Sequence, residues 1–305
     1  MIVITGSEKG KMISRDKDGK CFHTGLKKGE VYPYVLVVGP PGRVRRTALH
    51  LKNTTAIGDG VERGIVLVNG YYNEVPVTVL NHDMGAASAS IIIREVIDSI
   101  SFKEKNKATI IRIGSCGSLQ EYVKVGDIVI SAGCVRDDGT TQLLIHSEYP
   151  AVPNMKTTLS LILAAKKIGR KVGDNLWVGI THAKSELYGF ESPQLSAMPK
   201  EMGERLKSFE RMGVLATEME FPVLAILGDL YNAEQRRTAR PYGIDTGCAL
   251  LVVSPFKVEG EPVKFREPSQ EDLIRVGLEA LDIKRKLDLG RFDDSKSLLD
   301  ALTVL

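Results

Sequence analysis

Short apolar segments, each about as long as one β-strand, recur along the chain and constrain its fold more than any other feature. Helix-length segments separate several of them. Strands that alternate with helices are typical of an α/β fold, and near-continuous apolar strands indicate a sheet covered on both faces. We therefore predict a single-domain α/β/α sandwich with a central mixed sheet. The expected strands span 34–38, 64–68, 75–80, 109–114, 127–131, 177–181 and 249–253, and the expected helices span 43–51, 87–100, 156–168, 200–211 and 221–231.

The polar first 20 residues differ from the rest of the chain. We expect 1–20 to be a mobile N-terminal extension and 21–305 to form one domain. The extension has no apolar stretch of the signal-peptide kind, and no run of 18 apolar residues occurs anywhere in the sequence. Residues 232–243 are expected to form a polar insertion before the last core strand, and 290–305 a short packing tail.

Charge and cysteine usage exclude several classes of function. The 41 Lys and Arg residues nearly balance the 38 Asp and Glu residues, and they are dispersed, so we expect no nucleic-acid or membrane partner. Cys21, Cys116, Cys134 and Cys248 form no C-x-x-C pair and have no histidine at metal-ligand spacing. We expect free thiols in a reducing cytoplasm, with no metal and no cofactor.

Two glycine-containing turns follow apolar strands and are suited to an anion. Gly39 and Arg43 lie where a strand meets a helix, so backbone N–H groups can approach an anion beside an arginine, although an ordinary βα turn has the same pattern. Arg112 lies inside an apolar strand, where a charge is costly unless it pairs with a buried acid or a bound oxyanion. Ser115 adds a hydroxyl in the turn that follows. These residues predict a phosphate site.

Two carboxylates, Glu218 and Glu220, lie close together in a segment that otherwise has a core pattern. We expect 218–220 to open the helix that continues through 221–231. A helix start favours acids through its dipole alone, and a carboxylate there can also bind ribose hydroxyls. An anion pocket and a hydroxyl-binding carboxylate in one chain predict chemistry at a sugar carbon with phosphate as a reactant.

The chain resembles the nucleoside phosphorylase-I superfamily, and the uridine phosphorylases within it most closely. The resemblance rests on motifs that keep the family's order along most of the chain. They are Phe-His-Thr-Gly-Leu at 22–26, Gly-Pro-Pro-Gly-Arg-Val at 39–44, Ile-Arg-Ile-Gly-Ser-Cys-Gly at 111–117, Val-Gly-Asp-Ile at 125–128, Val-Arg-Asp-Asp-Gly at 135–139, Glu-Tyr-Pro-Ala-Val at 148–152, and residues 213–220.

This resemblance implies roles for individual residues. Arg112 and Glu220 are implied to be catalytic. Arg63 and His23 match residues that reach into a neighbouring subunit's site, which implies a homo-oligomer, at least a dimer, with shared active sites. The implied phosphate-binding residues are Gly39, Arg43, Arg63, Arg112 and Ser115, the ribose-binding residues are His23, Met219 and Glu220, and the base-binding residues are Cys116, Gly117, Leu187 and Glu218.

The base pocket departs from the family pattern. Leu187 stands where phenylalanine is common, and Glu191 and Pro193 stand where uridine phosphorylases carry the glutamine and arginine that read uracil. We take Gln194 as the candidate for a displaced amide. Purine enzymes have a catalytic aspartate where Ser254 stands.

The resemblance implies phosphorolysis, with uridine and phosphate giving uracil and ribose 1-phosphate in pyrimidine salvage. Phosphate is the co-substrate. The turn at 115–117 is more similar to that of purine enzymes, so a purine or broad-specificity phosphorylase is an alternative. A hydrolytic nucleosidase is disfavoured because that branch lacks the phosphate arginines. A catalytically silent nucleoside-binding homologue is the alternative from another class.

Overall fold

The computed structural model describes residues 13–58, 63–102, 106–256 and 265–304. Within these ranges, nine strands form one mixed sheet in the order β2-β3-β4-β1-β5-β8-β7-β6-β9. The strands are β1 Tyr34–Val38, β2 Lys52–Ala56, β3 Leu67–Tyr72, β4 Val75–Asn81, β5 Lys107–Ser118, β6 Ile128–Asp137, β7 Leu176–Lys184, β8 Ala216–Glu218 and β9 Gly243–Ser254.

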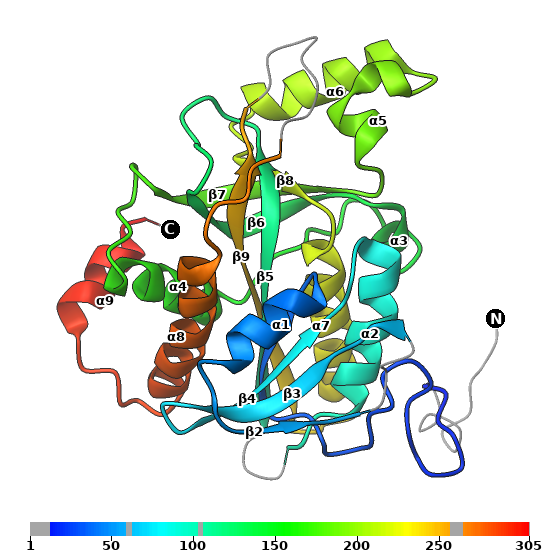
Figure 1. Cartoon of the computed structure of the whole chain (residues 1–305), viewed down its shortest axis with the longest axis vertical. Coiled ribbons are helices and arrows are strands. Elements are labelled where there is room, and N and C mark those ends of the chain that lie inside the picture. Colours follow the sequence, from blue (N-terminus) through cyan, green and yellow to red (C-terminus); the bar gives the residue numbers. More distant parts are fainter. Residues whose placement is uncertain (1–12, 59–62, 103–105, 257–264, 305) are drawn as a thin grey trace.

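Helices cover both faces of the sheet, which confirms the α/β/α sandwich. Figure 1 shows α2 and α7 on one side and α4, α8 and α9 on the other. Each side has its own apolar core, with Ile93 and Phe221 in one and Leu161 and Leu278 in the other. The helices are α1 Pro41–Ala48, α2 Ala86–Asp98, α3 Gly139–Gln142, α4 Met155–Lys167, α5 Tyr188–Glu191, α6 Pro199–Arg211, α7 Phe221–Arg237, α8 Glu271–Asp288 and α9 Ser295–Leu302.

The last strand closes part of the sheet on itself. β9 pairs in parallel with β5 along most of its length and antiparallel with β6, so β5, β8, β7, β6 and β9 form a closed ring. The central strand β1 is fully buried and pairs in parallel with β4 and β5. The carboxyl ends of β1, β4, β7, β8 and β9 therefore surround one region, which is where ligands bind in open α/β sheets.

Several predicted boundaries were wrong. β2, with the sequence Lys-Asn-Thr-Thr-Ala, was missed because its residues are all exposed and show no alternation. The strand expected at 64–68 lies at 67–72, and residues 218–220 end β8 and form a turn before α7. The first half of the insertion expected at 232–243 continues α7 through Arg237, which keeps Gln235 buried.

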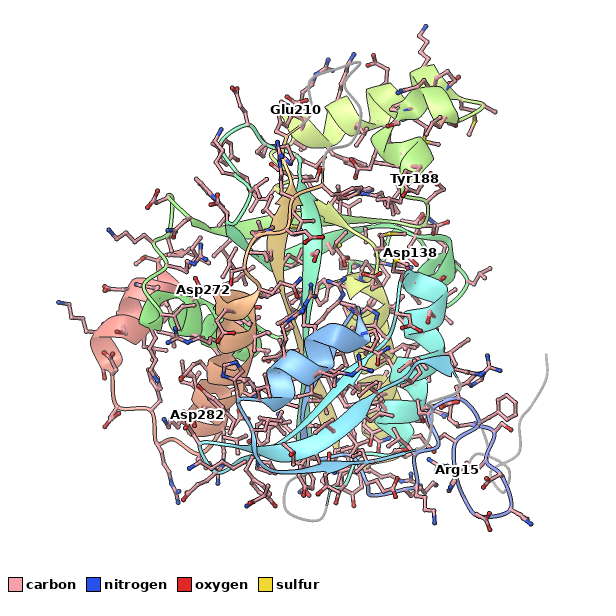
Figure 2. All side chains as sticks on the ribbon, in the orientation of Figure 1. Arg15, Asp138, Tyr188, Glu210, Asp272 and Asp282 are labelled. Atoms are coloured by element: carbon pink, nitrogen blue, oxygen red, sulfur yellow. The ribbon has the colours of Figure 1, made fainter. Side chains whose placement is uncertain are left out.

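The N-terminal segment is anchored where it is described. Residues 1–12 lie outside the described residues, but Arg15 donates from Nε to Asp98 Oδ2 at 3.0 Å, at the end of α2. Arg15, labelled in Figure 2, also donates to the carbonyl oxygens of Gly19 and Leu26. The division of the chain at residue 20 stays a prediction. In the described ranges, no helix has the length and apolar character needed to cross a membrane.

Candidate active site

A cavity of about 530 Å³ opens at the carboxyl ends of these strands. In Figure 2, Tyr188 on α5 and Glu210 near the end of α6 lie in the layer above this end of the sheet. The cavity is lined by residues that the sequence placed far apart. They are Gly39, Pro40, Pro41, Arg43, Asp83, Met84, Arg112, Gly114, Ser115, Cys116, Gly117, Lys184, Leu187, Glu191, Thr217, Glu218, Met219, Glu220, Val253, Ser254, Phe265 and Gln270.

Arg43 is held rigidly at one wall of this cavity. It lies in the first turn of α1, shortly after the end of β1, and is only 2% exposed. Its guanidinium donates to Gln270 Oε1 at 2.8 Å, to the carbonyl oxygen of Ile113 at 3.0 Å and to Ser115 Oγ at 3.0 Å. Burial, together with the nearby Arg112, lowers the pKa of Arg43 to about 10, so it remains a cation at neutral pH. The fixed arginine and the serine hydroxyl form a donor pair for an anion.

Arg112 pairs with both acids of the 218–220 segment. Nη1 lies 3.1 Å from Glu218 Oε2, and Nη2 donates to Glu220 Oε2. Of the two partners expected for Arg112, a buried acid or a bound oxyanion, the structure therefore shows the buried acid. Glu220 also accepts the backbone N–H of Gly85 at 2.7 Å. The two carboxylates hold the arginine in place at the cavity wall.

The two acids differ in their protonation tendency. Burial raises the pKa of Glu218, and the negative charge of Glu220 adds to this effect although Arg112 opposes it. For Glu220, burial acts to raise the pKa, but Arg112, His82 and the Gly85 N–H outweigh it and lower the pKa. Of the two, Glu220 is therefore the acid more strongly held in its ionised form, which can accept hydrogen bonds from hydroxyl groups.

A second ion pair lies in another part of the wall. Lys184, at the end of β7, donates to the carboxylate of Glu191 and to Thr217 Oγ1 at 3.0 Å. A Cβ placed on Gly117 would lie 3.6–3.7 Å from atoms of Thr217, Glu191 and Ser254, so these groups surround one point. In the sequence, Glu191 stands out only as a departure from the family pattern, and no motif points to Lys184. A lysine at the end of an apolar strand was the available signal.

The structure brings together ten of the predicted site residues and leaves three outside. Among the described residues, His23, Arg63 and Gln194 do not line the cavity. Gln194 lies exposed on the 3-10 turn Pro193–Leu195, so Glu191 and not Gln194 reaches the wall. The residues that do line it are Gly39, Arg43, Arg112, Ser115, Cys116, Gly117, Leu187, Glu218, Met219 and Glu220.

His23 and Arg63 lie together on another part of the surface. His23 Nδ1 is 2.7 Å from Glu95 Oε1, and the Arg63 guanidinium lies 5.7 Å from the ring centre of Phe22. Phe22 is 68% exposed and meets the His23 ring edge-on. An exposed aromatic ring beside a histidine and an arginine is suited to a contact with another protein surface.

Comparison with known proteins identifies the family. The phosphorylase superfamily matches residues 33–234. Uridine phosphorylase of Treponema pallidum (strain Nichols) is 28% identical over 263 residues, covering 86% of this chain and 93% of that protein. Purine nucleoside phosphorylase of Plasmodium falciparum (isolate 3D7) is 29% identical over 267 residues, covering 86% and 96%. The fold is similar to the crystal structure of uridine phosphorylase from Vibrio fischeri ES114, with a TM-score of 0.68, 22% identity, and 89% and 99% of the two chains covered.

The chain belongs to the phosphorylase superfamily. This confirms the resemblance that the motifs in the sequence carried.

Proposed function

We propose that the protein is a nucleoside phosphorylase that cleaves uridine with phosphate to give uracil and ribose 1-phosphate. The observation that carries the proposal is one cavity lined by Arg43 and Ser115 at one wall and by the Arg112–Glu220 pair beside it. An anion site next to a carboxylate suits a phosphate and a ribose in contact. Uridine phosphorylases and purine nucleoside phosphorylases are among the similar proteins, which supports the reaction class.

In this proposal, the protein positions the reactants and stabilises charge. Glu220 accepts hydrogen bonds from the ribose hydroxyls, while Arg43 and Ser115 hold phosphate beneath the sugar. The bond between the anomeric carbon and the base breaks, its electron pair leaves with the base, and a phosphate oxygen bonds to that carbon. Arg112 pairs with Glu220 and so offsets the repulsion between that carboxylate and the anion. Fixed donors of this kind supply much of the catalysis in such sites.

The charges of the cavity support a site that two subunits share. Three cationic side chains line it against four acidic ones, so the cavity of one chain has no excess of positive charge for a phosphate dianion. We propose that Arg63 of a neighbouring subunit supplies the missing charge and that His23 comes with it. Both lie on an exposed patch outside their own cavity. A homodimer is then the smallest active unit. The charged residues of the cavity are Arg43, Arg112 and Lys184, and Asp83, Glu191, Glu218 and Glu220.

The purine or broad-specificity alternative has support of its own. Purine nucleoside phosphorylases are among the similar proteins at the same level of identity as the uridine enzymes. Against it, Ser254 lines the cavity where the purine enzymes are expected to carry an aspartate. A serine cannot protonate a purine ring as a carboxylic acid can, so uridine remains the preferred proposal.

The test is release of base from uridine, thymidine, inosine and adenosine with and without phosphate. Phosphate-dependent release, fastest from uridine, is the expected result. Release at the same rate without phosphate would indicate a hydrolase, and binding of uridine without turnover would indicate a silent homologue. If inosine or adenosine were the best substrate, the purine alternative would replace the uridine assignment.

A matched pair of variants tests the anion site. Arg43→Gln should raise the KM for phosphate, with a loss of roughly 100-fold in kcat/KM, as for other single preorganised donors. Arg46→Gln is the control because Arg46 lies on the same helix and also donates to Gln270 Oε1, but does not line the cavity. Equal effects of both variants would remove Arg43 from the phosphate site. Arg112→Ala is a poorer test, since it would leave two buried acids without their cation.

A further inference from the structure

The Lys184–Glu191 pair has no part in holding phosphate or ribose. Lys184 is only 2% exposed and Glu191 only 9%, yet both line the cavity. Burying two charges is costly, and an ion pair rarely repays that cost in stability over apolar residues of similar size. A buried pair that faces a ligand cavity therefore points to recognition of a ligand.

The ammonium of Lys184 is oriented by a chain of hydrogen bonds. Lysine has only donors, so Thr217 Oγ1 must accept from it and turns its own proton toward His182 Nδ1, 2.9 Å away. His182 then carries its proton on Nε2 and donates to Asp137 Oδ2 at 3.1 Å. Arg205 on α6 pairs with the same Asp137. The direction of every donor in this chain is thus fixed.

One donor of the ammonium is left for a ligand. Among the residues that the structure describes, Nζ has two acceptors, Glu191 and Thr217, for its three N–H bonds. The adjacent Glu191 carboxylate is an acceptor only. The wall therefore presents a cationic donor and an anionic acceptor side by side.

We propose that Lys184 and Glu191 read the base, and that they select bases with a ring N–H next to a carbonyl. This rests on the proposed function. The ring N–H donates to Glu191, and the neighbouring carbonyl oxygen accepts from Lys184. Uracil and thymine have this edge, as do the 6-oxopurines. Cytosine and adenine instead carry an amino group next to a bare ring nitrogen, which puts a donor before Lys184 and an acceptor before Glu191.

The same arrangement assists bond cleavage. When the bond from the anomeric carbon to the base breaks, the electron pair stays with the base, and the negative charge spreads onto the carbonyl oxygen. Lys184 lies against that oxygen and stabilises the charge as it develops. A buried hydrogen-bonding site of this kind rejects an analogue that leaves its groups unpaired.

The experiment compares kcat/KM for uridine and inosine with that for cytidine and adenosine. Wild type should favour the first pair by at least roughly 100-fold. Lys184→Met should lose most of that preference, with the KM for phosphate unchanged. Lys167→Met is the control, because Lys167 makes an ion pair with Glu279 away from the cavity. Lys184→Met leaves the buried Glu191 without its cation and could therefore unfold the protein. The double variant Lys184→Met with Glu191→Leu replaces the whole pair, so it should fold. It should discriminate between the bases as poorly as the single variant.

Two results would overturn the proposal. The first is that wild type cleaves cytidine or adenosine as fast as uridine and inosine. The second is that the double variant keeps the wild-type preference. Calorimetric titration with free uracil and cytosine gives an answer even without turnover. If wild type bound uracil and the double variant did not, base recognition by Lys184 and Glu191 would be supported even if the phosphorylase function had failed. Equal binding of uracil and cytosine by wild type would refute it.

Discussion

The guanidinium of Arg112 lies directly over Gly114, two residues further along β5. A Cβ placed on Gly114 would be 2.0 Å from Nη1 and 2.5 Å from Cζ of Arg112. Residues two apart in a strand point to the same face. The Arg112 side chain can therefore lie along its own strand toward residue 114 only if that residue has no side chain. In that position, it meets the carboxylates of Glu218, the last residue of β8, and of Glu220 in the turn that follows. Gly114 is therefore required for the Arg112 ion pairs.

Gly114→Ala should displace Arg112 and weaken both ion pairs. We expect a loss of about 1–3 kcal/mol in the free energy of unfolding, as for other overpacked sites, together with loss of phosphorolysis. Urea denaturation measures the first effect. Gly117→Ala is the control for stability, because its Cβ would make only ordinary contacts of 3.6–3.7 Å. If both variants were equally stable, the contact between Arg112 and Gly114 would not constrain the strand.

Glu220→Gln should reduce activity on ribonucleosides more than on 2′-deoxynucleosides. The variant keeps the shape of the side chain but loses charge-assisted hydrogen bonds, which are roughly twice as strong as neutral ones. The ratio of kcat/KM for uridine and deoxyuridine measures the effect. Glu279→Gln, which changes a partly buried glutamate bonded to Tyr72 and Lys167 outside the cavity, should leave the ratio unchanged. An equal loss on both sugars would show that Glu220 acts only through Arg112.

Acid should destabilise the protein partly through His82. Burial lowers the pKa of His82 from 6.5 to about 4, although Glu220 acts to raise it. Between these two values, the unfolded chain binds a proton that the folded chain does not, so stability falls as the pH drops from about 6.5 to about 4. The loss is on the order of 3 kcal/mol.

His82→Leu should flatten this dependence. Within the described residues, neither ring nitrogen of His82 has a hydrogen-bond partner, so the substitution breaks no bond of the ring. Urea denaturation at several pH values between 4 and 7 gives the slope, with His146→Leu at an exposed position as the control. If His82→Leu left the slope of the free energy of unfolding against pH unchanged, other groups would be responsible for the acid sensitivity.

Mixed oligomers test the shared site. Arg63→Ala and Arg43→Gln chains should each have strongly reduced activity alone. After subunit exchange, a dimer with one chain of each kind has one site with both arginines intact, so about a quarter of all sites should recover in a random mixture of two-fold dimers. Exchange of subunits must first be demonstrated. If activity then did not recover, Arg63 would serve the site of its own chain or no site at all.

Most elements that are buried along their whole length could be predicted from the sequence. Residues 34–38 and 109–114 are apolar because both faces of the sheet are covered, and that pattern is local. β2 could not be found because an exposed edge strand needs no apolar residue. The ends of β5 and β9 extend well beyond the predicted ranges because they pair with each other, which depends on contacts distant in sequence.

The candidate site was predictable where a residue type is costly without a partner. Arg112 in an apolar strand required an ion, and the structure supplies Glu218 and Glu220. The base end was not predictable in the same way. Gln194 was chosen by proximity in sequence, but the 3-10 turn that carries it leaves it exposed, and the short helix α5 turns Glu191 inward instead. Which residue of a short loop faces a cavity depends on the packing of that loop.

The hydrogen bond from Arg43 to Gln270 has a consequence for how such proteins diversify. The family match ends at residue 234, but Gln270 and Ser254 lie beyond it and still line the cavity. A chimaera that joined residues before 235 to the C-terminal segment of a relative would keep Arg112 and Glu220 on one inherited block. It would exchange the partner of Arg43 and the strand that closes the sheet. Recombination at this boundary would thus alter the surroundings of the anion while leaving the sugar-binding carboxylate in place.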